Sequence, residues 1–224
     1  MKRLFTICYG RRINILRIAE DTVAAEHLLD VQSDIKFNDR LVVEKSTYAL
    51  ILLLELVDVL PELVFKGGTS ILLRTFPPKR FSIDLDIILP RKYQGRIDDV
   101  LEGLTGADKF FHRFQLDERR SGKAFLAHYF LFFNSYHTES EQYILLDILY
   151  HDDPPYASVE AVPVTVPLLL GENFPEVTIP SMEGLFADKL VAIAGNDLGI
   201  PLNDTFEMQY VKQIVDLDTL FEHI

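Results

Sequence analysis

A short glycine-containing stretch near the middle of the sequence has residue types that can bind phosphate. Gly67 and Gly68 follow the apolar run 63–65 and precede Thr69. A glycine pair lets backbone N–H groups approach a ligand closely, and a helix starting directly behind it adds the positive end of its dipole. This pattern predicts a loop that holds a triphosphate. The alternative for the glycine pair alone is an ordinary turn after a strand.

Asp84 and Asp86 form a second candidate group, two residues apart in the partly alternating stretch 81–89. Alternation is typical of a β-strand, so we expect both carboxylates on one face of a sheet. Unpaired carboxylates are costly to bury, and hard oxygen ligands suit Mg²⁺, which binds few carboxylates together with substrate phosphates. The alternative for this pair alone is an edge strand whose polar face meets water.

The glycine pair followed by the two aspartates is a more specific signal of a nucleotide-binding site than either group alone. A glycine turn, a short helix and an Asp-x-Asp strand place a phosphate binder beside a metal binder. A two-metal clamp needs a further carboxylate on a neighbouring strand. Asp147, the one acid within the apolar run 144–149, is the candidate. The alternative is a structural aspartate with satisfied hydrogen bonds.

The surrounding pattern predicts the elements that position these residues. Thr69 is expected to cap a short helix over residues 70–74, and Ser181 to cap a later helix that Gly195 ends. Helical spacing of apolar residues predicts helices over 13–30, 40–60, 96–104, 181–194 and 206–222. Apolar or alternating runs predict strands over 63–65, 81–89, 124–134 and 143–150, with an edge or irregular strand over the proline-containing run 162–170. This order indicates an α+β fold, with a mixed sheet flanked by helices over residues 1–178 and a helical C-terminal part over residues 179–224.

Composition and charge limit the possible partners. The 224 residues, 48% hydrophobic and 25% charged, are typical of a folded domain. The longest apolar run is too short to cross a membrane. The single cysteine, Cys8, excludes an internal disulfide and a cysteine-based metal site, which fits a cytoplasmic protein.

The net charge of −12 is unevenly distributed. Residues 1–138 contain 20 Lys or Arg and 18 Asp or Glu, whereas residues 139–224 contain 2 and 16. A polyanion would therefore approach the N-terminal part. The best candidate surface is 109–123, where basic residues alternate with phenylalanines that could stack on bases. The alternative is a solvated loop with its aromatic rings in the core. The residues concerned are Lys109, Arg113, Arg119, Arg120 and Lys123, with Phe110, Phe111 and Phe114.

Five blocks of residues resemble one known family. The blocks are 43–54, 65–70, 80–86, 187–190 and 212–217, and they contain Lys-Gly-Gly-Thr-Ser, Ser-x-Asp-x-Asp and Ala-Asp-Lys-Leu. They resemble the AbiEii/AbiGii toxin family of nucleotidyltransferases, within the polymerase-β-like superfamily. The resemblance implies a nucleotidyltransferase-type mixed sheet.

The resemblance also implies roles for single residues. Gly68 and Thr69 would hold the triphosphate, and Asp84 and Asp86 would hold Mg²⁺ or Mn²⁺. Lys189 would neutralise phosphate charge, a role that charge counting supports, because Lys189 is one of only two basic residues after position 138. The remaining members of the implied site are Lys66 and Gly67 in the loop, Arg80 and Ser82 beside the aspartates, and Asp216 near the C-terminus.

Members of this family are nucleotidyltransferases that act as toxins. The implied reaction moves a nucleoside monophosphate from an NTP to an acceptor hydroxyl on RNA, notably tRNA, and the implied partner is a cognate antitoxin. Two positions depart from the family pattern, Lys212 in place of arginine and Gln213 in place of an acid. The alternatives are transfer to a protein or a small molecule, such as a cationic aminoglycoside, and a catalytically silent nucleotide-binding protein.

Overall fold

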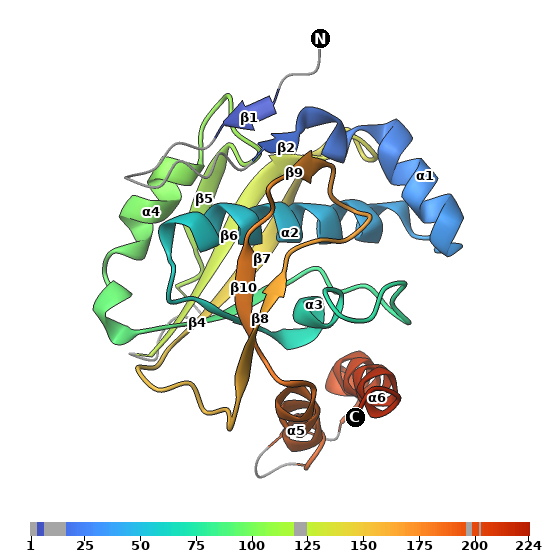
Figure 1. Cartoon of the computed structure of the whole chain (residues 1–224), viewed down its shortest axis with the longest axis vertical. Coiled ribbons are helices and arrows are strands. Elements are labelled where there is room, and N and C mark those ends of the chain that lie inside the picture. The colour runs from blue at the N-terminus through green and yellow to red at the C-terminus, as the bar shows by residue number, and fades with distance from the viewer. Residues whose placement is uncertain (1–3, 7–16, 119–124, 196–198, 202) are drawn as a thin grey trace.

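The chain folds as a mixed α+β structure. The structure, a computed structural model, describes residues 4–6, 17–118, 125–195, 199–201 and 203–224. A seven-stranded sheet has the order β5-β6-β7-β4-β3-β10-β8, and a small sheet has the order β1-β2-β9 (Figure 1). The α+β prediction is confirmed. The strands are β1 Leu4–Thr6, β2 Arg17–Ala19, β3 Val64–Lys66, β4 Leu85–Leu89, β5 Arg113–Leu116, β6 Leu126–Asn134, β7 Glu141–Tyr150, β8 Val159–Pro163, β9 Gly171–Glu172 and β10 Glu176–Pro180.

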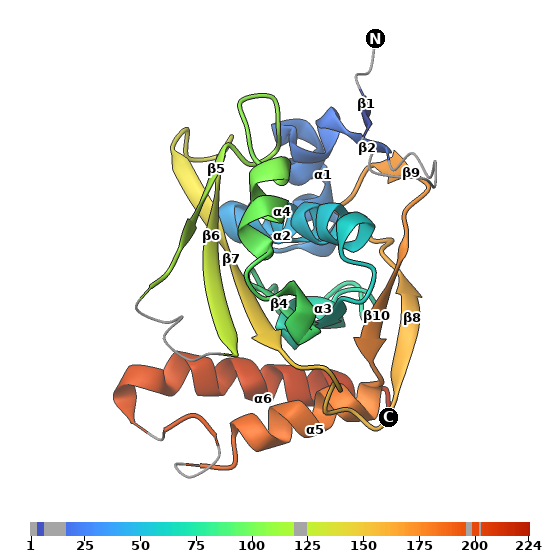
Figure 2. The same cartoon turned by 90° about the vertical axis from the view of Figure 1, so that its left-hand side faces the viewer.

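Helix α2, Arg40–Val59, forms the centre of the core. Asp39 caps it, since its carboxylate accepts a hydrogen bond from the Val42 N–H at 3.1 Å. The side chains from Ala49 to Leu54 are fully buried. Figure 2 shows why: the sheet curves so that β5–β7 lie on one side of α2 and β8 and β10 on the other. Burial on several sides explains the wide apolar face of the sequence. The other helices are α1 Ala25–Ile35, α3 Gly67–Ile71, α4 Ile97–Leu104, α5 Met182–Ala192 and α6 Glu207–Phe221, with 3₁₀ turns at Glu20–Val23, Arg91–Tyr93 and Asp204–Phe206.

Helices α5 and α6 pack together at one end of the sheet (Figure 2). Ser181 caps α5 as predicted, accepting a hydrogen bond from the Gly184 N–H at 3.2 Å. Between the two helices lies a small apolar cluster of Ile71, Leu185 and Leu220, separate from the main core. Because Ile71 belongs to α3, this cluster fixes α5 and α6 against the segment that follows the glycine pair.

The predicted helix over residues 13–30 is wrong over much of its length. Residues 17–19 form β2, which pairs with β1 and β9, and α1 begins only at Ala25. Residues 13–16 lie outside the described residues. Pairing with strands distant in the sequence therefore overrides the local helical spacing here.

Three other boundaries differ from the expectations. Helix α3 begins at Gly67, so Thr69 lies inside it and caps nothing. Strand β4 begins at Leu85, which leaves Asp84 in the segment that enters the strand. The edge strand expected over residues 162–170 is β8, which ends at Pro163, because the second proline and its neighbours no longer pair.

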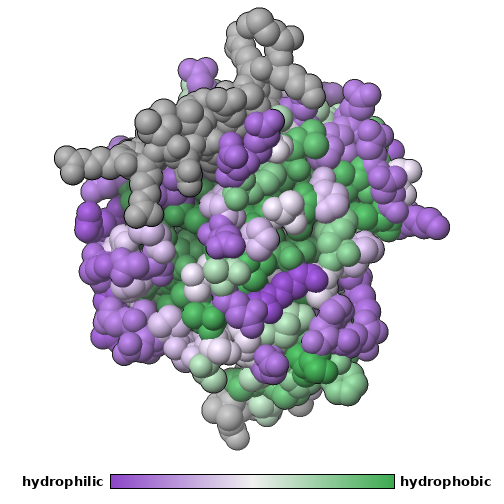
Figure 3. Space-filling model, viewed as in Figure 1, coloured by the Kyte–Doolittle hydropathy of each residue, from purple (hydrophilic) through white to green (hydrophobic). Residues whose placement is uncertain are grey.

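Hydrophobic and hydrophilic residues are unevenly distributed on the surface. Figure 3 shows hydrophobic residues across the middle of the face seen in Figure 1, with hydrophilic residues mostly along its sides. Within the part of the chain that the structure describes, no helix is both long and apolar enough to cross a membrane.

Candidate active site

Four polar side chains form a row across four neighbouring strands. Lys66 of β3 lies opposite Asp86 of β4, Asp86 lies opposite Asp147 of β7, and Asp147 lies opposite His128 of β6. Register partners on adjacent strands project to the same face of a sheet. The predicted pairing of Asp86 with Asp147 on a neighbouring strand is therefore present as a direct register contact.

His128 was not predicted from the sequence as a site residue. Its Nδ1 lies 2.5 Å from Oδ1 of Asp147, and the imidazole is largely buried. The contact holds one oxygen of Asp147 in a fixed direction. Only the register of β6 against β7 brings the two residues together, and 19 positions separate them in the sequence.

The environment of Asp86 disfavours its negative charge. Burial raises the pKa of Asp86 to about 6, and the nearby carboxylates of Asp147 and Asp84 add to this effect. Lys66 and Lys189 act in the opposite direction. A carboxylate in this state gains from any additional cation, since the cation relieves the repulsion among the three acids.

The glycine pair is needed for close packing around the acids. Gly67 has φ +77°, and a Cβ there would lie 2.1 Å from Oδ2 of Asp86. A Cβ on Gly68 would lie 2.6 Å from a terminal nitrogen of Arg80 and 2.9 Å from Oγ of Ser82. A side chain at Gly67 would overlap Asp86, and one at Gly68 would displace Arg80 and Ser82, so the backbone at the start of α3 lies directly against Asp86.

Thr69 and Ser82 contribute to the framework of the site. The Thr69 hydroxyl is fully buried and donates to the backbone oxygen of Asp84 at 2.5 Å. The backbone oxygen of Ser82 accepts a hydrogen bond from Ser46 of α2 at 2.8 Å. These two bonds fix the segment that carries Asp84, and they leave the Thr69 hydroxyl engaged within the protein.

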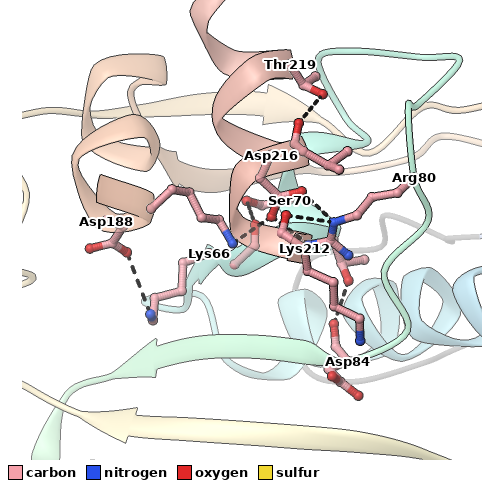
Figure 4. Close-up of polar contacts among 12 residues, drawn as sticks. Lys66, Ser70, Arg80, Asp84, Asp188, Lys212, Asp216 and Thr219 are labelled. Atoms are coloured by element: carbon pink, nitrogen blue, oxygen red, sulfur yellow. Dashed lines mark hydrogen bonds and ion pairs between the residues drawn. The ribbon is translucent and has the colours of Figure 1, made fainter. Parts of the chain in front are cut away.

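Asp216 of α6 is surrounded by cations. Its Oδ1 accepts from Nε of Arg80 at 2.7 Å, and its Oδ2 accepts from a terminal nitrogen of Arg80 at 2.6 Å. The same Oδ2 lies 2.8 Å from Nζ of Lys189. Figure 4 shows Arg80 reaching from the segment before β4 to Asp216 on α6. Asp216 therefore ties α5, α6 and the strand entrance together, and both its oxygens are occupied.

Lys66 has partners that were not predicted. Its Nζ lies 3.7 Å from Oδ2 of Asp188 on α5, and the Tyr156 hydroxyl donates to the same oxygen at 2.5 Å. Burial and the bond to Asp188 raise the pKa of Tyr156, so it stays a donor. Asp188 directly precedes Lys189, so one turn of α5 supplies both a partner for Lys66 and a cation near Asp86.

The donor set fits a divalent cation that is completed by a substrate. Asp86 and Asp147 face each other across β4 and β7, and Asp84 lies two residues before Asp86 in the segment that enters β4. Within the described ranges, no three His, Cys, Asp or Glu side chains are placed to hold a metal ion unaided. Mg²⁺ keeps several ligand positions for water and substrate phosphate, so few carboxylates suffice.

The comparisons with known proteins identify the family and the fold. Residues 51–224 match the family described as "Nucleotidyl transferase AbiEii toxin, Type IV TA system". Among solved structures, a candidate nucleotidyltransferase from H. pylori aligns with a TM-score of 0.51 at 20% identity, over 81% of this chain and 67% of that one. An antigenic nucleotidyltransferase-like protein from Paracoccidioides brasiliensis aligns with a TM-score of 0.52 at 12% identity, over 80% and 77%.

A third structure, JHP933 from Helicobacter pylori, aligns with a TM-score of 0.49 at 20% identity. The alignment covers 80% of this chain and 65% of JHP933, so the chain spans about two thirds of that relative. No curated protein matches the chain.

Proposed function

The chain belongs to the AbiEii family of nucleotidyltransferases, and we propose that it transfers a nucleoside monophosphate from an NTP to a hydroxyl of RNA, with tRNA as the main acceptor. In this proposal the protein is the toxin of a toxin–antitoxin system, acts in the cytoplasm and is restrained by a cognate antitoxin. The observation that carries the proposal is the pairing of Asp86 with Asp147 beside the glycine pair at the start of α3, where a Cβ on Gly67 would overlap Asp86.

On the nucleotide side, the backbone of Gly67 and Gly68 binds the phosphates. Lys66 and Lys189 lie within electrostatic range of Asp86 and offset the charge of the triphosphate. Asp84, Asp86 and Asp147 would hold Mg²⁺ or Mn²⁺, which supplies charge neutralisation at the phosphoryl oxygens and lowers the pKa of the acceptor hydroxyl. Arg80, Ser82 and Thr69 keep these groups in place through the contacts described above.

On the acceptor side, the hydroxyl oxygen attacks the α-phosphorus in line with the leaving pyrophosphate. A new P–O bond forms as the bond to pyrophosphate breaks, and the proton of the hydroxyl passes to Asp147 or to solvent. His128 orients the Asp147 carboxylate for this step. Asp216 is a positioning residue, because Arg80 and Lys189 already occupy its oxygens.

A transfer assay tests the proposal. The protein is incubated with Mg²⁺, total RNA or tRNA, and each ribonucleoside triphosphate labelled at the α-phosphate. We expect label on RNA with the wild type and a loss of at least ~100-fold with Asp86→Asn. The matched control is Asp34→Asn, an exposed acid on α1 at the opposite end of the molecule from α5 and α6 (Figure 1). Equal labelling by wild type and Asp86→Asn would refute the catalytic assignment.

Parallel reactions with an aminoglycoside and with total protein as acceptors test the choice of RNA. Label on either of these acceptors, with none on RNA, would replace RNA as the substrate while leaving the transfer chemistry intact. Label on none of the acceptors, together with NTP binding, would indicate a silent nucleotide-binding protein.

A further inference from the structure

Three aromatic rings cluster on the outer face of the sheet. Phe130 and Phe132 of β6 and Tyr143 of β7 alternate with the buried residues of their strands, so they lie on the face away from the core, the same face as His128 and Asp147. Their ring centroids lie 4.9 Å apart for Phe130 and Tyr143, and 6.0 Å apart for Phe132 and Tyr143. Tyr143 is 46% exposed. We call Phe130, Phe132 and Tyr143 the aromatic platform.

Two cations border the aromatic platform. The guanidinium carbon of Arg113 on β5 lies 3.3 Å from the centroid of Phe132, and Nζ of Lys45 lies 4.9 Å from the centroid of Tyr143. Arg113 is also paired with Glu141, which holds its planar group over the ring. Lys45 belongs to the N-terminal part of α2 and also lies within electrostatic range of Asp84, so it is close to both Tyr143 and the carboxylates. Aromatic faces beside Lys and Arg are the features that bind bases and phosphates of single strands.

The aromatic platform lies on the same strands as Asp147 and His128, the end of the polar row where we place the acceptor. Tyr143, Leu145 and Asp147 alternate on one face of β7, so Tyr143 lies about 13 Å from Asp147 along the strand. That length corresponds to about four stacked nucleotides at roughly 3.4 Å each. The glycine pair lies on the other side of Asp147, across β4 and directly after the end of β3. An occupant of the platform therefore reaches Asp147 from the side away from the triphosphate.

Among the described residues, no helix covers this outer face of β5–β7 (Figure 2). One exposed and two partly exposed aromatic rings, with bordering cations and a path to the carboxylates, fit a polynucleotide better than a single small acceptor. Double-stranded RNA keeps its bases stacked within the helix, whereas an unpaired end can lay its bases on aromatic side chains.

We propose that the aromatic platform binds the single-stranded 3′ end of the RNA acceptor and directs its terminal hydroxyl to Asp147. Bases stack on the ring of Tyr143 and on the guanidinium plane of Arg113, which Phe132 supports from below, and Lys45 contacts a backbone phosphate. This inference rests on the proposed function, since it assigns the RNA to one surface of the same site. It accounts for sequence tolerance along the strand, because stacking uses the face that every base has.

The test measures RNA binding separately from transfer. The probe is a short oligoribonucleotide labelled at its 5′ end with a fluorophore and ending in an unpaired 3′ segment, and the readout is fluorescence anisotropy. We expect Tyr143→Ala and Phe132→Ala each to weaken binding about 5- to 100-fold. Tyr143→Phe keeps the ring and is expected to bind as the wild type does. The matched control is Tyr136→Ala, which removes a tyrosine that is 61% exposed and lies in the turn after β6.

Two further measurements make the result decisive. The same probe with its 3′ end paired in a blunt duplex is expected to bind more weakly than the unpaired one. The KM for NTP is expected to stay unchanged in Tyr143→Ala, because the ring lies away from the glycine loop. Thermal melting of each variant confirms that it is folded, which is expected because these rings are partly exposed.

The outcomes separate this inference from the proposed function. If wild type and both alanine variants bind the probe equally, the platform assignment is wrong whether or not transfer occurs. If the variants change the oligomeric state and leave RNA binding unchanged, the face is an interface between copies of the chain, and the inference is overturned. If the platform binds RNA but the wild type transfers no label, the surface stands and the proposed reaction fails.

Discussion

Arg80 holds Asp216 through two hydrogen bonds of 2.7 Å and 2.6 Å, and this pair joins the entrance of β4 to helix α6. The segment with Arg80 continues directly into Asp84 and Asp86, whereas Asp216 lies near the C-terminal end of the chain. The position of Asp84 and Asp86 therefore depends on α6, although α6 contributes no carboxylate of its own to the row across the sheet.

Asp216→Ala is expected to lower the free energy of unfolding by about 3–5 kcal/mol. The substitution leaves Arg80 and Lys189 without their shared counter-ion at a position where Asp216 is only 4% exposed. Urea denaturation measures the effect. The control is Asp218→Asn on the same helix, which breaks an exposed pair with Lys79 and is expected to cost less than about 1 kcal/mol. An equal decrease in the free energy of unfolding in both variants would show that the buried contacts of Asp216 stabilise the fold no more than the exposed pair of Asp218 with Lys79.

Gly67→Ala is expected to reduce transfer at least ~100-fold and to destabilise the fold. The new methyl group would overlap Oδ2 of Asp86, and the left-handed backbone adds about 1–2 kcal/mol of strain. Gly95→Ala is the matched control, because Gly95 has φ +78° with nothing within 4 Å of the added Cβ. It suffers the same backbone strain without the overlap. Transfer assays and thermal melting on both variants separate the two effects, and equal activity in both would contradict the packing argument.

His128→Ala is expected to lower kcat about 10- to 100-fold with little change in the KM for NTP. The substitution frees the carboxylate of Asp147 to rotate away from the position that the 2.5 Å contact imposes. His27→Ala on α1 serves as the control, since His27 contacts the backbone oxygen of Leu168 away from the row. An increase in KM without a change in kcat would indicate that His128 acts on nucleotide binding instead.

Glu55 is expected to make the stability of the protein fall as the pH rises. Burial raises its pKa from 4.5 to about 8, and its Oε2 has no hydrogen-bond partner among the described residues. The folded state therefore keeps the proton that the unfolded state releases, so the stabilising contribution is complete below pH 4.5 and is lost as the pH rises through 8.

Glu55→Gln removes this titration. The free energy of unfolding of the wild type, relative to Glu55→Gln, is expected to decline by a few kcal/mol between pH 4.5 and pH 8. Urea denaturation across this range measures the decline. A difference that does not change with pH would show that Glu55 titrates normally.

The part of the candidate site that lies close together in the sequence could be predicted from the sequence. The glycine pair, Asp84 and Asp86 lie within 20 positions of one another, and their chemistry is visible in residue types and spacing. The helices corresponding to α2, α4, α5 and α6 were also predicted, because their apolar spacing matches their burial in the folded chain.

The contacts between residues far apart in the sequence could be identified only from the structure. Asp147 was recognisable as an acid in an apolar strand, but the register of β4, β7 and β6 decides that it faces both Asp86 and His128. Strand β10, Glu176–Pro180, and edge strand β5 were missed because they are short and depend on their neighbours. Arg119, Arg120 and Lys123 of the predicted basic segment lie outside the described residues, and Phe111 of the same segment is fully buried in the core.

In the proposed reaction, two stretches of chain supply different parts of the site and meet along the row from Lys66 to His128. Residues 64–89 supply the glycine loop and the first two acids, whereas residues 113–150 supply the third acid, its histidine and the aromatic platform. They meet along one pair of parallel strands, β4 and β7. Grafting the 113–150 meander of a relative onto this chain, with that single seam preserved, would exchange the acceptor while the donor nucleotide stays the same. Under the proposed assignment, acceptor choice can therefore change without a change in the residues that bind the donor nucleotide.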